Sequence, residues 1–184
     1  IALGVTISSF YNDSKEEESA ERSLRFLNAS LGEVGSEEKF LSFADDYEDT
    51  LGGVAQYRAA SIQYGDDRFA ESAKSFLAAA SRLTGDPLLG RAKIGHAVSL
   101  IKNDQKDDGR NALVSISNDA SLLNVDRFEA RYLLGVDALG KNDQNGYEAQ
   151  RKALSEDLNA ADFLSRLVEY ERLNRLYNQA KSLP

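Results

Sequence analysis

The hydrophobic positions of this chain recur mainly at intervals of three and four residues, which is typical of helices with one buried face. Residues 53–83 show the pattern most clearly, with two such stripes separated by a polar turn. The apolar positions there are Val54, Tyr57, Ala60 and Tyr64, followed by Phe69, Ala73, Phe76, Leu77 and Ala80. No sustained alternation of apolar and polar residues appears, so strands have little support. The pattern predicts an all-α chain.

Turn signals divide the helical stretches at regular places. The only prolines are Pro87 and Pro184, so residues 14–86 contain no obligatory helix breaker. The segments between turns are about 12–18 residues long, the size of one helix in a helical-hairpin repeat. The turn signals, rich in Gly, Asp and Asn, lie at residues 32–35, 52–53, 65–67, 85–87, 103–105, 118–119 and 140–146.

Small residues recur together with these turns. Ala60, Gly95 and Gly135 each lie in the first helix of a predicted hairpin, and they are 35 and 40 positions apart. Small side chains let two antiparallel helices approach closely, and the bulky Phe76 then fills the gap, as a tetratricopeptide repeat (TPR) requires. The TPR period is about 34 residues, so we place an insertion at residues 102–108. The alternative interpretation is a generic helical bundle with coincidental Leu-Gly pairs.

Further helices are predicted on both sides of the repeats. Residues 16–31 and 37–47 each carry an apolar face. Residues 160–183 form a predicted amphipathic helix suited to cap the open end of a repeat stack, which needs a polar outer face. The expected domain, residues 13–184, is therefore an α-α superhelix of TPR-like helical hairpins, with N-terminal helices and a C-terminal capping helix.

The first residues have a different character. Residues 1–7 carry no charge, Phe10 and Tyr11 are placed where an aromatic belt meets a bilayer surface, and the charged residues 15–18 follow. We expect residues 1–12 to be the end of a transmembrane anchor, since a span needs about 20 apolar residues in all. The alternative is a short apolar strand or strap packed on the domain. A signal-peptide remnant is disfavoured, because no small-residue cleavage site precedes the polar run.

Composition and charge then argue against several kinds of ligand, metal site and catalytic site. The 184 residues carry a formal charge of −8, which argues against binding a nucleic-acid backbone. The absence of cysteine removes disulfides and zinc–thiolate sites. A single histidine, His96, weakens the case for a multi-histidine metal site. The acidic residues 104–108 lack the spacing of a calcium loop, and residues 52–53 lack the Lys-Ser/Thr of a phosphate loop. We expect no metal, no cofactor and no enzyme, although a buried ionisable cluster lining one pocket would revive catalysis.

Short motifs in a fixed order carry a family resemblance. These motifs lie at residues 1–11, 19–20, 39–44, 49–52, 68–73, 113–116, 134–135 and 142–146. Together they resemble the periplasmic part of the single-pass, TPR-type ancillary subunits of the bacterial SecYEG translocon. The resemblance implies an inner-membrane protein whose periplasmic TPR domain contacts translocon subunits or periplasmic chaperones, with no catalytic residues. Residues 15–21 and the insertion before Gly109 depart from the family pattern, which leaves the partner open.

The resemblance also suggests which residues meet a partner. TPR stacks bind partners mainly through a concave surface lined by the first helix of each hairpin. Carried over by register, this surface contains Tyr57, Ser61, Tyr64, Ala92, His96, Ser99, Tyr132 and Val136. Tyrosines suit such a role because they combine a large contact area with a polar tip. The alternatives are ordinary inter-helix packing for Tyr57 and Tyr132, and a histidine without chemistry for His96.

Two functions follow from these observations. The first is a non-enzymatic scaffold that is tethered to the membrane in the periplasm and docks translocation or chaperone machinery. The second is a structural subunit of an envelope or pilus-type assembly, a homo-oligomer that self-associates through its N-terminal helix or its terminal cap. The partner, the oligomeric state and the contributing groove residues stay open at this point.

Overall fold

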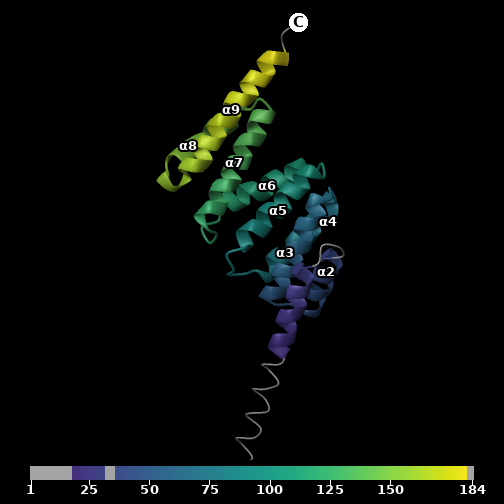
Figure 1. The fold of residues 1–184 in the computed structure, drawn as a ribbon. Helices are drawn as coiled ribbons and strands as arrows, with labels where there is room; N and C mark the ends of the chain where they lie inside the picture. The colour runs from purple at the N-terminus through teal and green to yellow at the C-terminus, as the bar shows by residue number, and fades with distance from the viewer. Residues whose placement is uncertain (1–17, 32–35, 182–184) are drawn as a thin grey trace, which may run out of the picture.

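The computed structural model describes residues 18–31 and 36–181, and within them every regular element is a helix (Figure 1). Residues 18–31 are helical and precede a series in which successive helices pack against one another, while the last long helix packs mainly on the second helix before it. The series is α2 (Ser36–Asp46), α3 (Thr50–Gly65), α4 (Phe69–Arg82), α5 (Leu89–Lys102), α6 (Lys106–Asn118), α7 (Asn124–Gly140), α8 (Gln144–Ser155), the 3-10 turn η1 (Leu158–Ala160) and α9 (Ala161–Lys181). The predicted all-α class is confirmed.

Three helical hairpins, α3–α4, α5–α6 and α7–α8, are closed by the same turn. The middle residue of each turn has a positive φ: 59° at Asp67, 63° at Asp104 and 58° at Asn142. Asp and Asn tolerate this left-handed conformation better than most residues. The following residue then donates its backbone N–H to a carbonyl five positions back, which satisfies the helix end in a Schellman motif. These bonds are Arg68 to Gln63, Gln105 to Leu100 and Asp143 to Ala138, each 2.9 Å long.

The shared turn fixes the true register of the repeats. Its left-handed residues are 37 positions apart (67 to 104) and then 38 positions apart (104 to 142). Counting back seven residues makes Ala60, Ala97 and Gly135 equivalent, and all three are buried. The predicted equivalence of Gly95 was therefore wrong by two residues. The predicted insertion at residues 102–108 was also wrong, because this turn is as short as the other two.

Gly95 is small for a different reason than the one its sequence pattern suggested. A Cβ added there would lie 2.7 Å from the ring of Phe76, a buried residue of α4. The Gly95 backbone and the Phe76 ring thus meet at the contact between α4 and α5. A small residue is needed at position 95 because α5 packs closely on the preceding hairpin. The spacing of residues within α5 does not reveal this contact.

Gly52 and Gly53 also differ from the prediction, because they lie in the first turn of α3 and not between two helices. Asp49 begins this helix, and its side chain accepts two backbone N–H bonds of 3.1 Å each. A Cβ on Gly53 would lie 2.9 Å from the Cβ of Arg82 and 3.1 Å from Cγ of Leu83. These glycines therefore serve close packing rather than chain reversal.

The core runs along the stack as neighbouring clusters. One cluster joins α2 with the start of the repeats, two lie at the junctions around α5, and one lies beneath α9. Alanine recurs twelve positions before each left-handed turn residue, as Ala55, Ala92 and Ala130, and each is completely buried. Because these positions have no room for a larger side chain, they set how closely successive helices approach.

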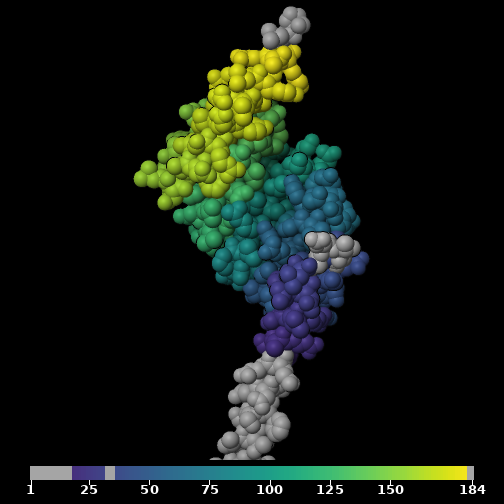
Figure 2. Space-filling view, in the orientation of Figure 1, coloured from purple at the N-terminus to yellow at the C-terminus, as the bar shows by residue number. Residues whose placement is uncertain are grey.

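The last helix caps the stack with its first half only. Leu167 is completely buried, and its Cδ1 would lie 2.8 Å from a Cβ on Gly135. Further along, Leu173, Leu176 and Tyr177 are 51%, 50% and 59% exposed. Helix α9 has 21 residues and α8 has 12, so the final turns of α9 extend beyond the rest of the molecule (Figure 2). The predicted C-terminal helix is thus present, and its first half packs on the preceding hairpin.

The predicted anchor, residues 1–12, lies outside the described residues. Within residues 18–31 and 36–181, no helix combines the length and the apolar content that a membrane span requires.

Candidate functional site

The predicted partner-binding residues all lie on α3, α5 and α7, which are the first helices of the three hairpins. Two of them, Ala92 and Ser99, are completely buried and are unavailable to a partner, which corrects the prediction. In the register that the turns define, Ala92 aligns with Ala55 and Ala130, which are also completely buried.

The three predicted tyrosines are half-buried and pack against neighbouring helices. The Tyr57 ring meets Phe76 edge-on at 5.3 Å between centroids, and Tyr64 meets Phe69 at 5.2 Å. Tyr132 lies beneath the guanidinium of Arg166, whose Cζ is 4.5 Å from the ring centroid. These contacts give each ring a structural role between helices. Val136 is likewise half-buried and packs on the cluster beneath α9.

His96 and the two buried serines beside it join the first two hairpins. The half-buried imidazole of His96 has its Nδ1 2.8 Å from the carbonyl oxygen of Ala73. Ser99 donates its hydroxyl to its own helix at 2.7 Å, and its Oγ lies 3.0 Å from Oγ of Ser72. Ser72 in turn bonds to the carbonyl of Ala60 at 3.0 Å. This network satisfies buried polar groups where α3, α4 and α5 meet.

Ser61 is the one fully exposed member of the predicted set, and it lines a groove of about 470 Å³. Three helices meet there, and each presents residues four positions apart, which share one helix face. The Phe26 and Phe40 rings, 5.8 Å apart between centroids, form an apolar floor together with Ile62. We call this site the Arg58 groove. Its lining residues are Phe26 and Ser30 from the first helix, Ser36 and Phe40 from α2, and Arg58, Ser61 and Ile62 from α3.

Arg58 differs from every other arginine of the described chain. Each of the other twelve pairs with a carboxylate, a carbonyl, a side-chain amide or an aromatic ring. Arg58 is exposed, and within residues 18–31 and 36–181 it has no such partner. Sequence reasoning selected its neighbour Ser61 but missed Arg58, since an unpaired arginine looks the same in a sequence as a paired one.

Glu37 directly follows Ser36, a residue of the groove lining, but its carboxylate already has partners elsewhere. Glu37 is bound by the guanidinium of Arg68 and accepts a 2.8 Å bond from Nε2 of Gln63. The bond from Arg68 holds the pKa of Glu37 below its usual range. Glu37 is therefore ionised at neutral pH, and its charge is balanced by Arg68. The positive charge of Arg58 stays uncompensated.

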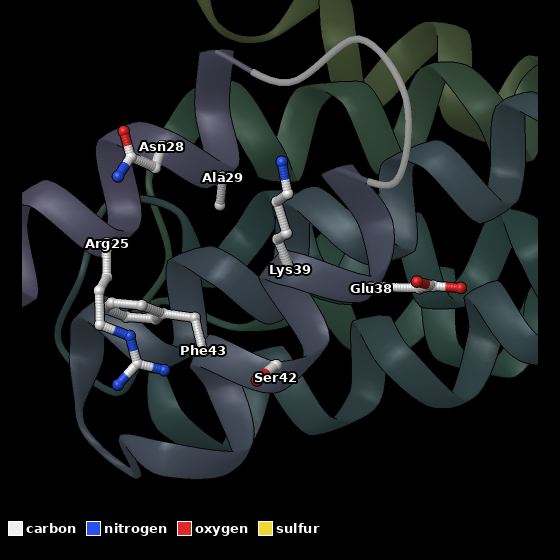
Figure 3. A pocket seen from close by; sticks show the side chains of 7 residues that line it. All are labelled: Arg25, Asn28, Ala29, Glu38, Lys39, Ser42 and Phe43. Atoms are coloured by element: carbon white, nitrogen blue, oxygen red, sulfur yellow. The ribbon is translucent and has the colours of Figure 1, made fainter.

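A second pocket, of about 320 Å³, lies between residues 18–31 and α2 (Figure 3). Its Arg25 pairs with Asp46 and lies over the Phe43 ring, with Cζ 6.0 Å from the ring centroid. The polar ends of Asn28, Lys39 and Glu38 point apart in Figure 3 and do not converge on one point. A specific ligand needs converging polar groups, so this pocket is the weaker candidate.

A third cavity, of about 290 Å³, lies where α5 and α7 begin, and it contains a buried acid that sequence reasoning missed. Asp126 is 1% exposed, and neither carboxylate oxygen receives a hydrogen bond. Its Oδ1 is 3.0 Å from Nε of Arg91, an ion pair whose angle is too poor for a hydrogen bond. Burial raises the pKa of Asp126, and the charge of Arg91 opposes this rise. Arg91 also binds Glu129, so the cluster links two hairpins.

Metal binding finds no support in the part of the chain that the structure describes. No three His, Asp or Glu side chains there gather closely enough to hold a metal ion. The acidic residues near the α5–α6 turn pair instead with basic neighbours: Lys106 lies 3.2 Å from Asp104, and Arg110 lies 2.6 Å from Asp107.

Comparison with known proteins does not place the chain in a family. It matches no family model, no curated protein and no solved structure.

Proposed function

We propose that this protein is a non-enzymatic scaffold that binds other proteins along its stack of helical hairpins. The observation that supports this most is the hairpin repeat itself, with one turn geometry used three times and each helix packed on its neighbours in the chain. Such a stack is elongated and exposes more surface than a compact bundle of the same length, and repeat proteins use that surface for partners. The Arg58 groove is the docking site on this surface.

The narrower form of the proposal is a TPR-type adaptor in the bacterial periplasm, anchored in the inner membrane beside the translocon or its chaperones. It rests on the family resemblance of the short sequence motifs. Tethering would raise the effective concentration of a partner near the membrane without any new contact.

Site-directed photo-cross-linking in cells tests the scaffold. The full-length protein would carry a photoreactive amino acid at Ser61 in the groove. The matched control position is Ser115, which is exposed on α6 and does not line the groove. We expect a discrete adduct from position 61 that is absent from position 115, and its mass and identity would decide the translocon version. Equal labelling at both positions, or none, would contradict the scaffold.

The second candidate function is a self-associating structural subunit, and exposed apolar residues at both ends of the stack favour it. Leu24, Leu27 and Leu31 are 57%, 50% and 71% exposed on the first helix, and α9 exposes Leu173 and Leu176. Contiguous exposed apolar residues often mark interaction sites. Light scattering on the purified chain at low micromolar concentration separates the two functions. A stable oligomer favours the structural subunit, and a monomer favours the scaffold.

A further inference from the structure

We infer that the Arg58 groove binds an acidic, apolar peptide segment, in which a carboxylate pairs with Arg58 and a bulky apolar side chain rests on the Phe26–Phe40–Ile62 floor. The inference rests on the proposed scaffold function and specifies the chemistry of its partner. It depends on two properties of the groove, an apolar floor and an unpaired cation, and no acid competes among the described residues of its lining.

The floor accounts for the apolar half of the ligand. Phe40 is 5% exposed, while Phe26 and Ile62 are half-buried and pack on the same cluster. All three line the groove, where an aliphatic or aromatic side chain would cover part of their surface. Removing apolar surface from water is favourable, so an apolar residue is favoured over a polar one at this place.

The cation accounts for the acidic half. Arg58 lies one turn before Ser61 and Ile62 on the same face of α3 and therefore stands beside the floor. A guanidinium binds a carboxylate through two parallel N–H donors, which gives orientation as well as attraction. The serine hydroxyls of Ser30 and Ser61 bond to carbonyls of their own helices, 2.9 Å away in both cases, and each hydroxyl oxygen retains acceptor capacity but carries no charge. None of the described residues that line the groove is acidic.

The protein as a whole repels acidic ligands, since its formal charge is −8. A carboxylate is therefore attracted only where a local cation is unbalanced, and Arg58 is such a place. Because screening at physiological salt acts over about 8 Å, the distant negative charges weaken this local pairing only slightly. This gives the groove selectivity: acidic peptides without an apolar anchor lack the contact with the floor, and neutral apolar peptides lack the ion pair.

Fluorescence anisotropy with labelled synthetic peptides tests the inference. The probe is a six-residue peptide that contains two Glu and two Leu residues. Three control peptides replace Glu by Gln, replace Leu by Ser, or carry a C-terminal amide in place of the free carboxylate. We expect the Gln and Ser peptides to bind at least about tenfold more weakly, which is the loss of one good contact. The amide separates a terminal carboxylate from a side-chain carboxylate as the group that Arg58 binds.

Protein variants then locate the site. Arg58→Gln should weaken binding of the acidic peptide about tenfold or more and leave binding of the Gln peptide unchanged. The matched control is Lys74→Gln. It also removes one positive charge, but from an exposed position on α4 that does not line the groove. Ser61→Glu places a carboxylate one turn from Arg58. This carboxylate should pair with the Arg58 guanidinium and abolish peptide binding. Ser61→Gln, which adds no charge, should not abolish it. These positions are exposed, and circular dichroism verifies that each variant is folded.

The outcomes separate the inference from the scaffold proposal. If the acidic and Gln peptides bind equally, or if Arg58→Gln binds like Lys74→Gln, the ligand chemistry is wrong even where cross-linking at Ser61 still captures a partner. If the acidic peptide binds as expected but no adduct forms in cells, the groove chemistry stands and the scaffold proposal fails.

Discussion

Gly90 provides the sharpest test of how the hairpins pack. Near the start of a helix, a Gly→Ala change ordinarily stabilises, since Gly costs about 0.5–1 kcal/mol relative to Ala in a helix. Here a Cβ would lie 2.1 Å from Oδ2, 2.4 Å from Cγ and 2.8 Å from Cβ of Asp126. Because Asp126 is 1% exposed, it cannot move without disturbing its junction with Arg91. Overpacking of this kind costs about 1–3 kcal/mol.

We therefore expect Gly90→Ala to destabilise the protein by about 2 kcal/mol, which lowers the melting temperature by about 4–8 °C for a domain of this size. Thermal unfolding followed by circular dichroism measures the effect. The control is Gly140→Ala, where an added Cβ meets nothing within 4 Å and little change is expected. In an Asp126→Ala background the cost of Gly90→Ala should fall by about 1 kcal/mol or more, because two of the three clashing atoms are gone. A Gly90→Ala variant that melts at or above the wild-type temperature, or strict additivity in the double variant, would refute the packing argument.

Three further predictions follow from other contacts. Ser72→Ala removes a buried hydroxyl that bonds to Ala60 and contacts Ser99; urea unfolding should show a loss of about 1–2 kcal/mol, against less than about 0.5 kcal/mol for exposed Ser81→Ala. Leu167→Ala leaves a cavity at a fully buried position of α9 and should lower the free energy of unfolding by about 2–5 kcal/mol. The control is Leu176→Ala, at a half-exposed position, which should change the urea midpoint very little. Equal losses of stability in the two variants would mean that the end of α9 is also packed. For Glu37, the bond from Arg68 lowers the folded-state pKa, so its stabilisation is present above the unfolded pKa of about 4.3 and is lost as pH falls through the lower folded value. Arg68→Gln should therefore lower the urea midpoint at pH 7, and the gap to wild type should narrow at pH 3; a gap that stays constant with pH would contradict this linkage.

The sequence alone determined the features that depend on local chemistry. Helices follow from the three- and four-residue spacing and from the scarcity of proline, and the hairpin turns follow from Asp and Asn at positions such as 67, 104 and 142. Each of these signals acts within a few residues, because a helix end is satisfied by its own neighbouring backbone groups. The all-α class and most of the helix boundaries could be predicted for that reason.

The tertiary structure decided the register of the repeats and the site. Gly95 and Gly135 look alike in the sequence, but one accommodates the Phe76 ring and the other accommodates Leu167. The choice of Ala92 and Ser99 as surface residues failed because both face neighbouring helices, which the spacing of residues within α5 does not reveal.

The candidate site depends on tertiary contacts even more strongly. Arginines of the described chain find partners far away in sequence, as Arg68 does with Glu37, 31 positions earlier, and Arg91 with Glu129, 38 positions later. Arg58 is distinguished by lacking such a partner, and its apolar floor comes from three separate helices. A sequence lists charges and apolar residues one by one, but whether a charge is balanced is a property of distance in space, since Coulomb attraction depends on separation and not on chain order.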